Sequence, residues 1–262
     1  MAEFRQPKGP VHAVGKAMEL VGLLLRARRP MTLAELSERA GYPKSTTHAL
    51  LATLQAYQMI RQEPDGKYCL GIGLYECGCA VAAAWDVRQT AAPYLERLAQ
   101  QTGTAAYLFL RSEDHALCVD RCVFGAGDGL LVSAEPGSRL PLHATAPGKL
   151  LLASASEAEL RRYCRASGLP PSTRHTITTE QELRAELEQI RARGYAAEDG
   201  EYRVGLRGAA APVREANGTV SWALSVMGLF PRPGTEEFRA IAAETVAAAA
   251  ALSAALGSDH GL

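Results

Sequence analysis

The residues best suited to enzyme chemistry are Ser133 or Ser138 combined with His143 and Asp120. A serine nucleophile needs a histidine as its base and a further group that orients this base. Neither serine lies in a G-x-S-x-G turn, and the six histidines are scattered singly along the chain. The sequence therefore predicts no enzyme activity. The alternative is a hydrolase or acyl-transfer enzyme that carries an accessory DNA-binding domain.

Cysteines and glycine-rich segments give no sign of a metal or a cofactor. The six cysteines include no C-x-x-C pair, and no histidines are spaced as zinc ligands. The segment Gly41–Ser45 ends like a phosphate-binding loop, but Pro43 stands where such a loop has a glycine. The Gly125–Gly129 run precedes an apolar segment and not a helix, so it lacks the dinucleotide-binding pattern. We expect neither a metal nor a cofactor.

The segment 43–57 has the composition of a helix that reads DNA. One side carries Thr47, Leu50, Leu51 and Leu54, whereas the other side carries small and weakly polar residues. A helix that is merely solvated normally has Lys and Glu there, but small residues let a helix approach base edges closely. The residues expected to contact DNA are Lys44, Ser45, Thr46, Thr47, His48, Ala49, Thr53, Lys67 and Tyr68. A helical subdomain that packs on a partner protein is the alternative.

Charge is distributed unevenly along the chain, although its formal net charge is zero. Residues 1–70 contain ten Lys or Arg and six Asp or Glu, which leaves 18 basic and 22 acidic residues for the rest. A basic first part on an acidic remainder is typical of a protein in which one end binds a polyanion. Arg5 and Lys8 in the N-terminal arm are expected to contact the DNA backbone.

Three helices and a hairpin are expected to position these residues. Helical spacing of apolar residues predicts helices over 13–27, 32–40 and 43–57. Thr32 and Glu35 form a capping-box pattern, and Pro43 suits the first position of the third helix. The turn Pro64-Asp65-Gly66 joins two short strands, 59–62 and 67–70. This order of elements predicts a winged helix-turn-helix.

The chain is long enough for two domains. We assign residues 1–73 to the winged helix-turn-helix, 74–89 to a linker helix and 90–262 to a second domain. Strands, then helices, then strands again predict an α+β fold with an antiparallel sheet, and one expected strand covers 130–133. Because the N-terminus is polar and Glu244 and Ser253 interrupt the alanine-rich end, we expect a cytoplasmic protein.

These residues resemble the IclR family of bacterial transcriptional regulators. The segments similar to its helix-turn-helix, wing, central motif and late motif are 34–54, 65–71, 139–149 and 198–213. The resemblance implies a GAF-like effector-binding domain and a homodimer or a dimer of dimers. It also implies that the protein binds double-stranded operator DNA and responds to a small, often acidic, metabolite. We expect a ligand-responsive repressor, and a DNA-binding protein without a ligand is the alternative.

The resemblance also implies an effector site and two departures from the family pattern. The effector-binding residues are expected to be Ala146, Pro147, Gly148, Glu198, Asp199, Gly208, Ser225 and Met227. Ala49 replaces a basic residue of the family, and Gln58 replaces a glycine. Members that sense very small acids often have Cys at the position of Gly208 and Ser at that of Met227. The extra room and lower polarity here favour an aromatic or partly apolar carboxylate, unless Gly208 and Met227 simply pack against each other.

Overall fold

The computed structural model describes residues 11–83, 86–124, 134–215 and 217–258. The chain forms two compact units, Met1–Asp86 and Val87–Leu262. Arg5, Lys8, Ser133, the Gly125–Gly129 run and the strand expected over 130–133 lie outside the described residues. Each unit has a hydrophobic core of its own.

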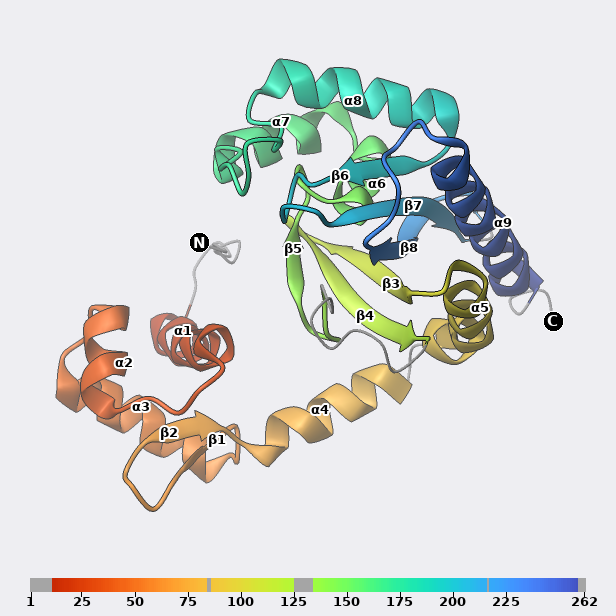
Figure 1. Ribbon diagram of the computed structural model, residues 1–262. Coiled ribbons are helices and arrows are strands. Elements are labelled where there is room, and N and C mark those ends of the chain that lie inside the picture. The colour runs from red at the N-terminus through yellow and green to blue at the C-terminus, as the bar shows by residue number, and fades with distance from the viewer. Residues whose placement is uncertain (1–10, 84–85, 125–133, 216, 259–262) are drawn as a thin grey trace. The chain divides into compact units, whose positions relative to one another are not determined.

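The first unit is the expected winged helix-turn-helix (Figure 1). Its elements are α1 (His12–Ala27), α2 (Leu33–Ala40), α3 (Lys44–Ala56), β1 (Ile60–Gln62), β2 (Tyr68–Leu70) and α4 (Ile72–Ala83). Apolar side chains of the helices and both strands form its core, among them Leu20, Leu36, Leu51 and Ile60. The strands pair antiparallel, with Ile60 opposite Leu70. The linker helix expected over 74–89 corresponds to α4, which is described to Ala83, and to the start of the next helix at Asp86.

Local sequence determines where α2 and α3 meet. The Thr32 side chain accepts a hydrogen bond from the Glu35 N–H, and Glu35 accepts one from the Thr32 N–H, so the capping box is complete. The helix ends at Gly41, whose φ of 70° is left-handed and favours glycine. Pro43 precedes the first residue of α3. These features hold α3 at a fixed angle to α2, which exposes one side of α3.

Gln58, just after α3, adopts a φ of 57° in the left-handed region, as its replacement of a family glycine predicts. This conformation costs a non-glycine residue about 1 kcal/mol. We therefore expect Gln58→Gly to raise the free energy of unfolding of the first unit by about 0.5–1 kcal/mol without loss of DNA binding. Chemical denaturation of the full chain measures this change. A destabilised Gln58→Gly variant would contradict it.

The second unit is an α+β domain with one six-stranded antiparallel sheet, as expected. Its helices are α5 (Asp86–Thr102), α6 (Ala146–Ala153), α7 (Glu157–Ser167), α8 (Glu180–Arg193) and α9 (Glu236–Ser258). Its strands are β3 (Ala105–Ser112), β4 (His115–Val123), β5 (Arg139–Pro141), β6 (Ala196–Asp199), β7 (Arg207–Arg214) and β8 (Val220–Gly228). The strand order is β5-β4-β3-β8-β7-β6.

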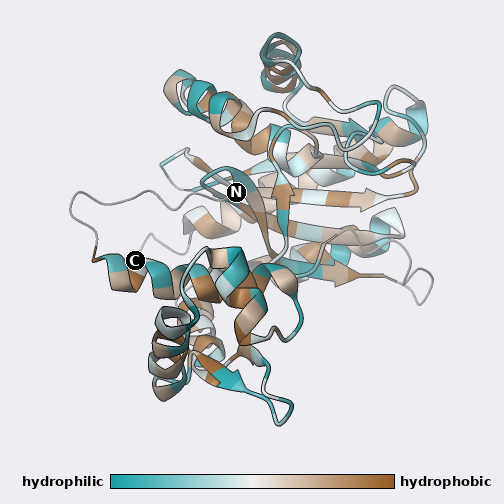
Figure 2. Ribbon diagram, turned by 90° about the vertical axis from the view of Figure 1, so that its left-hand side faces the viewer, coloured by the Kyte–Doolittle hydropathy of each residue, from teal (hydrophilic) through white to brown (hydrophobic). Residues whose placement is uncertain are grey.

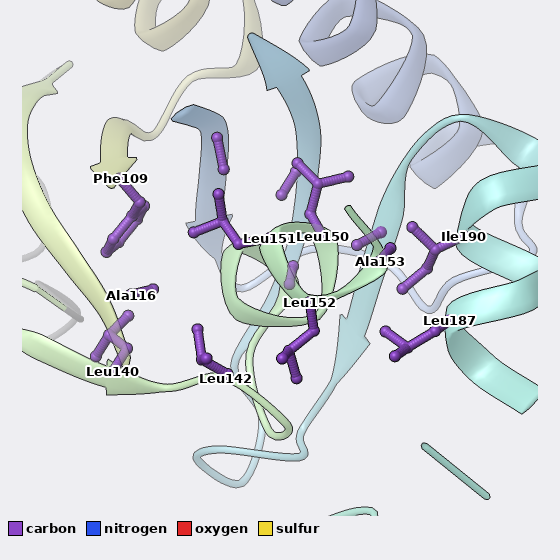
Figure 3. Packing of buried hydrophobic residues seen from close by; sticks show 14 of the residues in the cluster. Phe109, Ala116, Leu140, Leu142, Leu150, Leu151, Leu152, Ala153, Leu187 and Ile190 are labelled. Carbon is purple, nitrogen blue, oxygen red and sulfur yellow. The ribbon is translucent and has the colours of Figure 1, made fainter. Parts of the chain in front are cut away.

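Helices cover both faces of this sheet (Figure 1). The short helix α6 lies against β7 and β8, with its leucines between Phe109 of the sheet and Leu187 and Ile190 of α8 (Figure 3). Helices α7 and α8 alternate between hydrophilic and hydrophobic residues, as expected of helices with one buried side (Figure 2). The buried helix α6 therefore lies at the centre of the domain.

Helix α9 is, by length and composition, apolar enough to cross a membrane. It packs along β7 and β8 and buries Phe238, Ala242 and Leu252. Thr245, on the same side, is also buried, and its hydroxyl donates to the Ile241 carbonyl. This packing accounts for one apolar side of α9 as part of the domain core.

Candidate functional site

The DNA-facing candidates on α3 divide by exposure. Lys44, Ser45, His48, Ala49 and Thr53 are exposed. Thr46 is half-buried. Exposure is what contact with DNA requires, so these residues remain the predicted contact set. At 100° per residue, Ser45, Ala49 and Ala52 lie near the middle of the exposed side.

Two candidates are wrong as side-chain contacts because the core contains them. Thr47 is fully buried, and its hydroxyl donates to the Pro43 carbonyl at 3.2 Å. Tyr68 is only 5% exposed, and its backbone N–H and carbonyl pair with Met31. Both residues stabilise the first unit and do not face a ligand.

The wing offers less positive charge than its sequence suggests. The Lys67 ammonium lies 2.7 Å from the Asp65 carboxylate, and Arg61 lies 3.0 Å from Glu63. Both pairs are exposed, and such pairs contribute little to stability. Lys67 can therefore exchange Asp65 for a DNA phosphate at a small cost in free energy. Its contact with DNA stays a prediction.

Tyr42, in the turn before α3, contacts two residues of α1, and sequence reasoning missed these contacts. The Tyr42 hydroxyl donates to the Glu19 carboxylate, and the Lys16 ammonium lies 5.1 Å from the centre of the Tyr42 ring. The bond to Glu19 raises the pKa of Tyr42 to about 12. No sequence pattern marks this contact, because Tyr42 lies 23 residues from Glu19 along the chain.

Ala146, Pro147 and Gly148, expected to bind the effector, form the start of α6, and their backbone leaves no unused N–H group for a ligand. The Ala146 N–H donates to the Glu198 carboxyl at 3.4 Å, and the Gly148 N–H donates to the Thr145 hydroxyl at 3.2 Å. Pro147 has no N–H group. A Cβ on Gly148 would lie 2.5 Å from the Leu142 Cα, so glycine is needed for this close packing.

Glu198 lies fully buried beside this helix start. One of its oxygens accepts a hydrogen bond from the Tyr202 N–H at 3.1 Å, and the other accepts the bond from Ala146. Burial raises the pKa of Glu198 to about 8, although these bonds and Lys149 act in the opposite direction. The neighbouring Asp199 points to the opposite face of the sheet. It pairs there with Arg207 at 2.6 Å, so its predicted place in the same site is wrong.

A buried ion pair adjoins Glu198, and sequence reasoning missed it. The Lys149 ammonium lies 2.5 Å from one oxygen of Glu201 and 3.5 Å from Glu186. Lys149 is 1% exposed, and the second oxygen of Glu201 is buried without a partner among the described residues. Burial raises the pKa of Glu201 more than Lys149 lowers it. The sequence signal that could have indicated this ion pair is Lys149 itself, a lysine within the apolar sequence of α6.

Gly208, Ser225 and Met227 share the face of the sheet on which Glu198 lies. Gly208 stands between Glu198 and Met227 in the register. The Met227 Cγ lies 3.1 Å from the position of a Cβ on Gly208, so Met227 fills the room expected there. The Ser225 hydroxyl donates to the Ala209 carbonyl at 2.9 Å. Its oxygen is left as an acceptor for a ligand.

His143 and Asp120, two described residues of the enzyme alternative, each have other partners. Nδ1 of His143 lies 2.7 Å from the Tyr163 hydroxyl, and Nε2 lies 3.1 Å from the Pro170 carbonyl. Asp120 pairs with Arg88 instead. Burial lowers the pKa of His143, so its neutral ring connects helix α7 to the segment that follows it and has no nitrogen left to act as a base.

An exposed reading helix on one unit and a buried polar site in the other define a DNA-binding protein with a sensor domain. Residues 13–64 match the model of the IclR helix-turn-helix domain, and residues 79–254 match that of the bacterial transcriptional regulator IclR C-terminal domain. The chain belongs to the IclR family. Members are transcriptional regulators and not enzymes, which removes the enzyme alternative.

Relatives match the chain over nearly its whole length. The regulator XynR of Escherichia coli K12 is 33% identical over 94% of this chain and 98% of its own. The transcriptional repressor IclR of the same strain is 29% identical over 95% and 91%. A crystal structure of an IclR homologue from Microbacterium hydrocarbonoxydans complexed with 4-hydroxybenzoate superposes with a TM-score of 0.81 and 25% identity. It covers 94% of this chain and 99% of that one.

Proposed function

We propose that this transcriptional regulator is a repressor whose affinity for operator DNA changes when a small carboxylate binds its second unit. The observation that carries the DNA-binding part is the exposed, nearly uncharged side of α3 within a winged helix-turn-helix. Two relatives that are named as repressors support repression and not activation. A bacterial chromosome lies in the cytoplasm, so we infer that the protein acts there.

A homodimer or a dimer of dimers is part of this proposal. One winged unit makes few phosphate contacts, and two units that read two half-sites are the usual remedy. We expect the pseudo-palindromic operator that such symmetry requires. Light scattering of the full chain at micromolar concentration tests the assembly, and a monomer would contradict it.

The experiment that tests DNA recognition compares four variants of the full chain. We expect Ser45→Ala and His48→Ala to weaken binding to DNA from its own promoter region by about 1–3 kcal/mol for each true base contact. Lys44→Ala should weaken specific and non-specific binding alike, because a phosphate contact carries no sequence information. Fluorescence anisotropy at fixed salt measures all affinities.

The matched control is Thr47→Val, which changes a buried side chain on the same helix. It should lower stability but leave the ratio of specific to non-specific affinity unchanged. Unchanged affinities for all three exposed variants would contradict the assignment of α3 as the reading helix.

For the effector we propose a hydroxylated aromatic acid. Glu198 and the Ser225 oxygen offer hydrogen-bond acceptors to a ligand, and Met227 is a flexible apolar side chain that can adapt to a ring. A phenolic hydroxyl suits such acceptors, and Glu198, whose pKa burial raises to about 8, can donate its own proton to a ligand oxygen. The Microbacterium relative that binds 4-hydroxybenzoate supports this chemistry.

Calorimetric titration tests the effector with 4-hydroxybenzoate, benzoate, pyruvate and glyoxylate. We expect 4-hydroxybenzoate to bind tightest and Ser225→Ala to weaken it by about 0.5–1.5 kcal/mol. Met227→Ser should shift the preference toward pyruvate and glyoxylate. Tighter binding of the two small acids by the wild type would contradict the proposed effector class.

A further inference from the structure

Beyond Ser45 in the first turn, the middle of the exposed side of α3 consists of methyl groups. Ala49, Ala52 and Thr53 are exposed, and spacings of three and four residues put them on one side of the helix. The Thr53 hydroxyl donates to the Ala49 carbonyl at 3.0 Å. Because the hydroxyl proton is used within the helix, Thr53 offers its γ-methyl group and no hydrogen-bond donor to outside contacts.

Apart from Ser45 in the first turn, the polar residues of α3 lie at the edges of this surface. At 100° per residue, Lys44, His48 and Gln55 fall on one edge, while Ala49 and Ala52 lie near the centre. Arginine, which makes the commonest specific contact to guanine, does not occur in α3. The centre of the helix therefore has no group that can form a bidentate hydrogen bond with a base.

Apolar contact has one specific target in the major groove, the 5-methyl group of thymine. Small side chains also allow the helix axis to lie close to the bases, which such a contact requires. We propose that Ala49, Ala52 and the γ-methyl of Thr53 recognise thymine methyl groups and so determine the operator preference. This inference rests on the proposed DNA-binding function of α3.

The first step of the test selects DNA from a random duplex library with the full chain. We expect enriched half-sites that contain at least two fixed thymines. Each fixed thymine is then replaced by uracil, which removes only the 5-methyl group. We expect each replacement at a contacted position to weaken binding about 3–5-fold, the effect of one lost methyl contact. Replacement of a fixed cytosine by 5-methylcytosine is the control, and it should not strengthen binding.

The second step combines DNA and protein changes. In Ala49→Gly, replacing thymine by uracil at one of the sensitive positions should cause no further loss of affinity. In Ala52→Gly, the replacement at a different sensitive position should cause no further loss. Ala56→Gly is the matched control, since Ala56 is exposed on the same helix but near its end. It should keep the full uracil effect. Because each comparison is a ratio within one variant, a general loss of helix stability cancels.

The outcomes separate this inference from the proposed function. No enrichment of any sequence would contradict DNA recognition by the chain itself. Enriched half-sites without fixed thymines would overturn the methyl-recognition inference alone. So would uracil replacements that cost less than about 1.5-fold, or that cost the same in Ala49→Gly and Ala52→Gly as in the wild type.

Discussion

Replacing Lys149 by methionine should lower the free energy of unfolding of the second unit by about 3–5 kcal/mol. Methionine keeps much of the side-chain volume, so the loss comes from charge and not from a cavity. The Lys149 ammonium lies 2.5 Å from Glu201, and both side chains are buried. Without the ammonium, Glu201 must remain as an uncompensated buried carboxylate or take up a proton.

Chemical denaturation of the full chain measures this loss, followed by the fluorescence of Trp222 in β8 in a Trp85→Phe background. The penalty should be smaller at pH 5 than at pH 8, because protonation removes the charge of Glu201. The double variant Lys149→Met/Glu201→Leu should recover most of the stability, since no unpaired charge is then left. A double variant no more stable than Lys149→Met would show that the ion pair is not the cause.

Local signals in the sequence predicted the first unit well. The capping box of Thr32 and Glu35 and the left-handed turn at Gly41 are short-range features that act within one or two helical turns. The positive φ of Gln58 could be predicted because a resemblance marked that position as one that normally holds glycine. In each case the physical cause lies in neighbouring residues, so an isolated sequence carries it.

The two errors in the first unit concern burial. Thr47 is polar and lies in a helix with an exposed polar side, but its position on the wheel places it among Leu51 and Leu54 in the core. Tyr68 follows the half-buried Lys67, and strand alternation turns its ring inward. Residue type suggested contact with DNA, whereas the register of each element decided burial.

The buried polar site could not be derived from spacing. Lys149 and Glu201 are 52 residues apart, as are Ala146 and Glu198. Only the packing of α6 against β6 and β7 brings these groups together. The backbone donors at the start of α6, where effector-binding residues were expected, are used by Thr145 and Glu198. A helix start indicates where donors are, but only the fold shows whether they are free.

The stability of the second unit should fall as the pH rises, because of Glu198. The pKa of Glu198 is about 8 in the folded chain, whereas the ordinary value of a glutamate, which applies to the unfolded chain, is 4.5. Between these values the folded state holds a proton that the unfolded state has lost, so the stabilisation is complete below the lower value. This stabilisation is lost as the pH rises through the pKa of the folded state, about 8. We expect a loss of about 2 kcal/mol between about pH 6.5 and 8.5.

Glu198→Gln should remove most of this pH dependence, because the amide keeps an oxygen acceptor for the Tyr202 N–H and does not titrate. Glu201, whose pKa is also raised, should contribute the slope that remains. Measuring above pH 6.5 limits the contribution of His143, whose lowered pKa acts in the opposite direction at lower pH. Denaturation curves of the full chain, followed by Trp222 fluorescence in the Trp85→Phe background, give the slope for each variant. Replacement of the exposed Glu188 on α8 by glutamine is the control for the loss of one carboxylate. An equal slope in the wild type and Glu198→Gln would show that Glu198 is ionised in the folded chain, and it would then present a negative charge to any effector at this site.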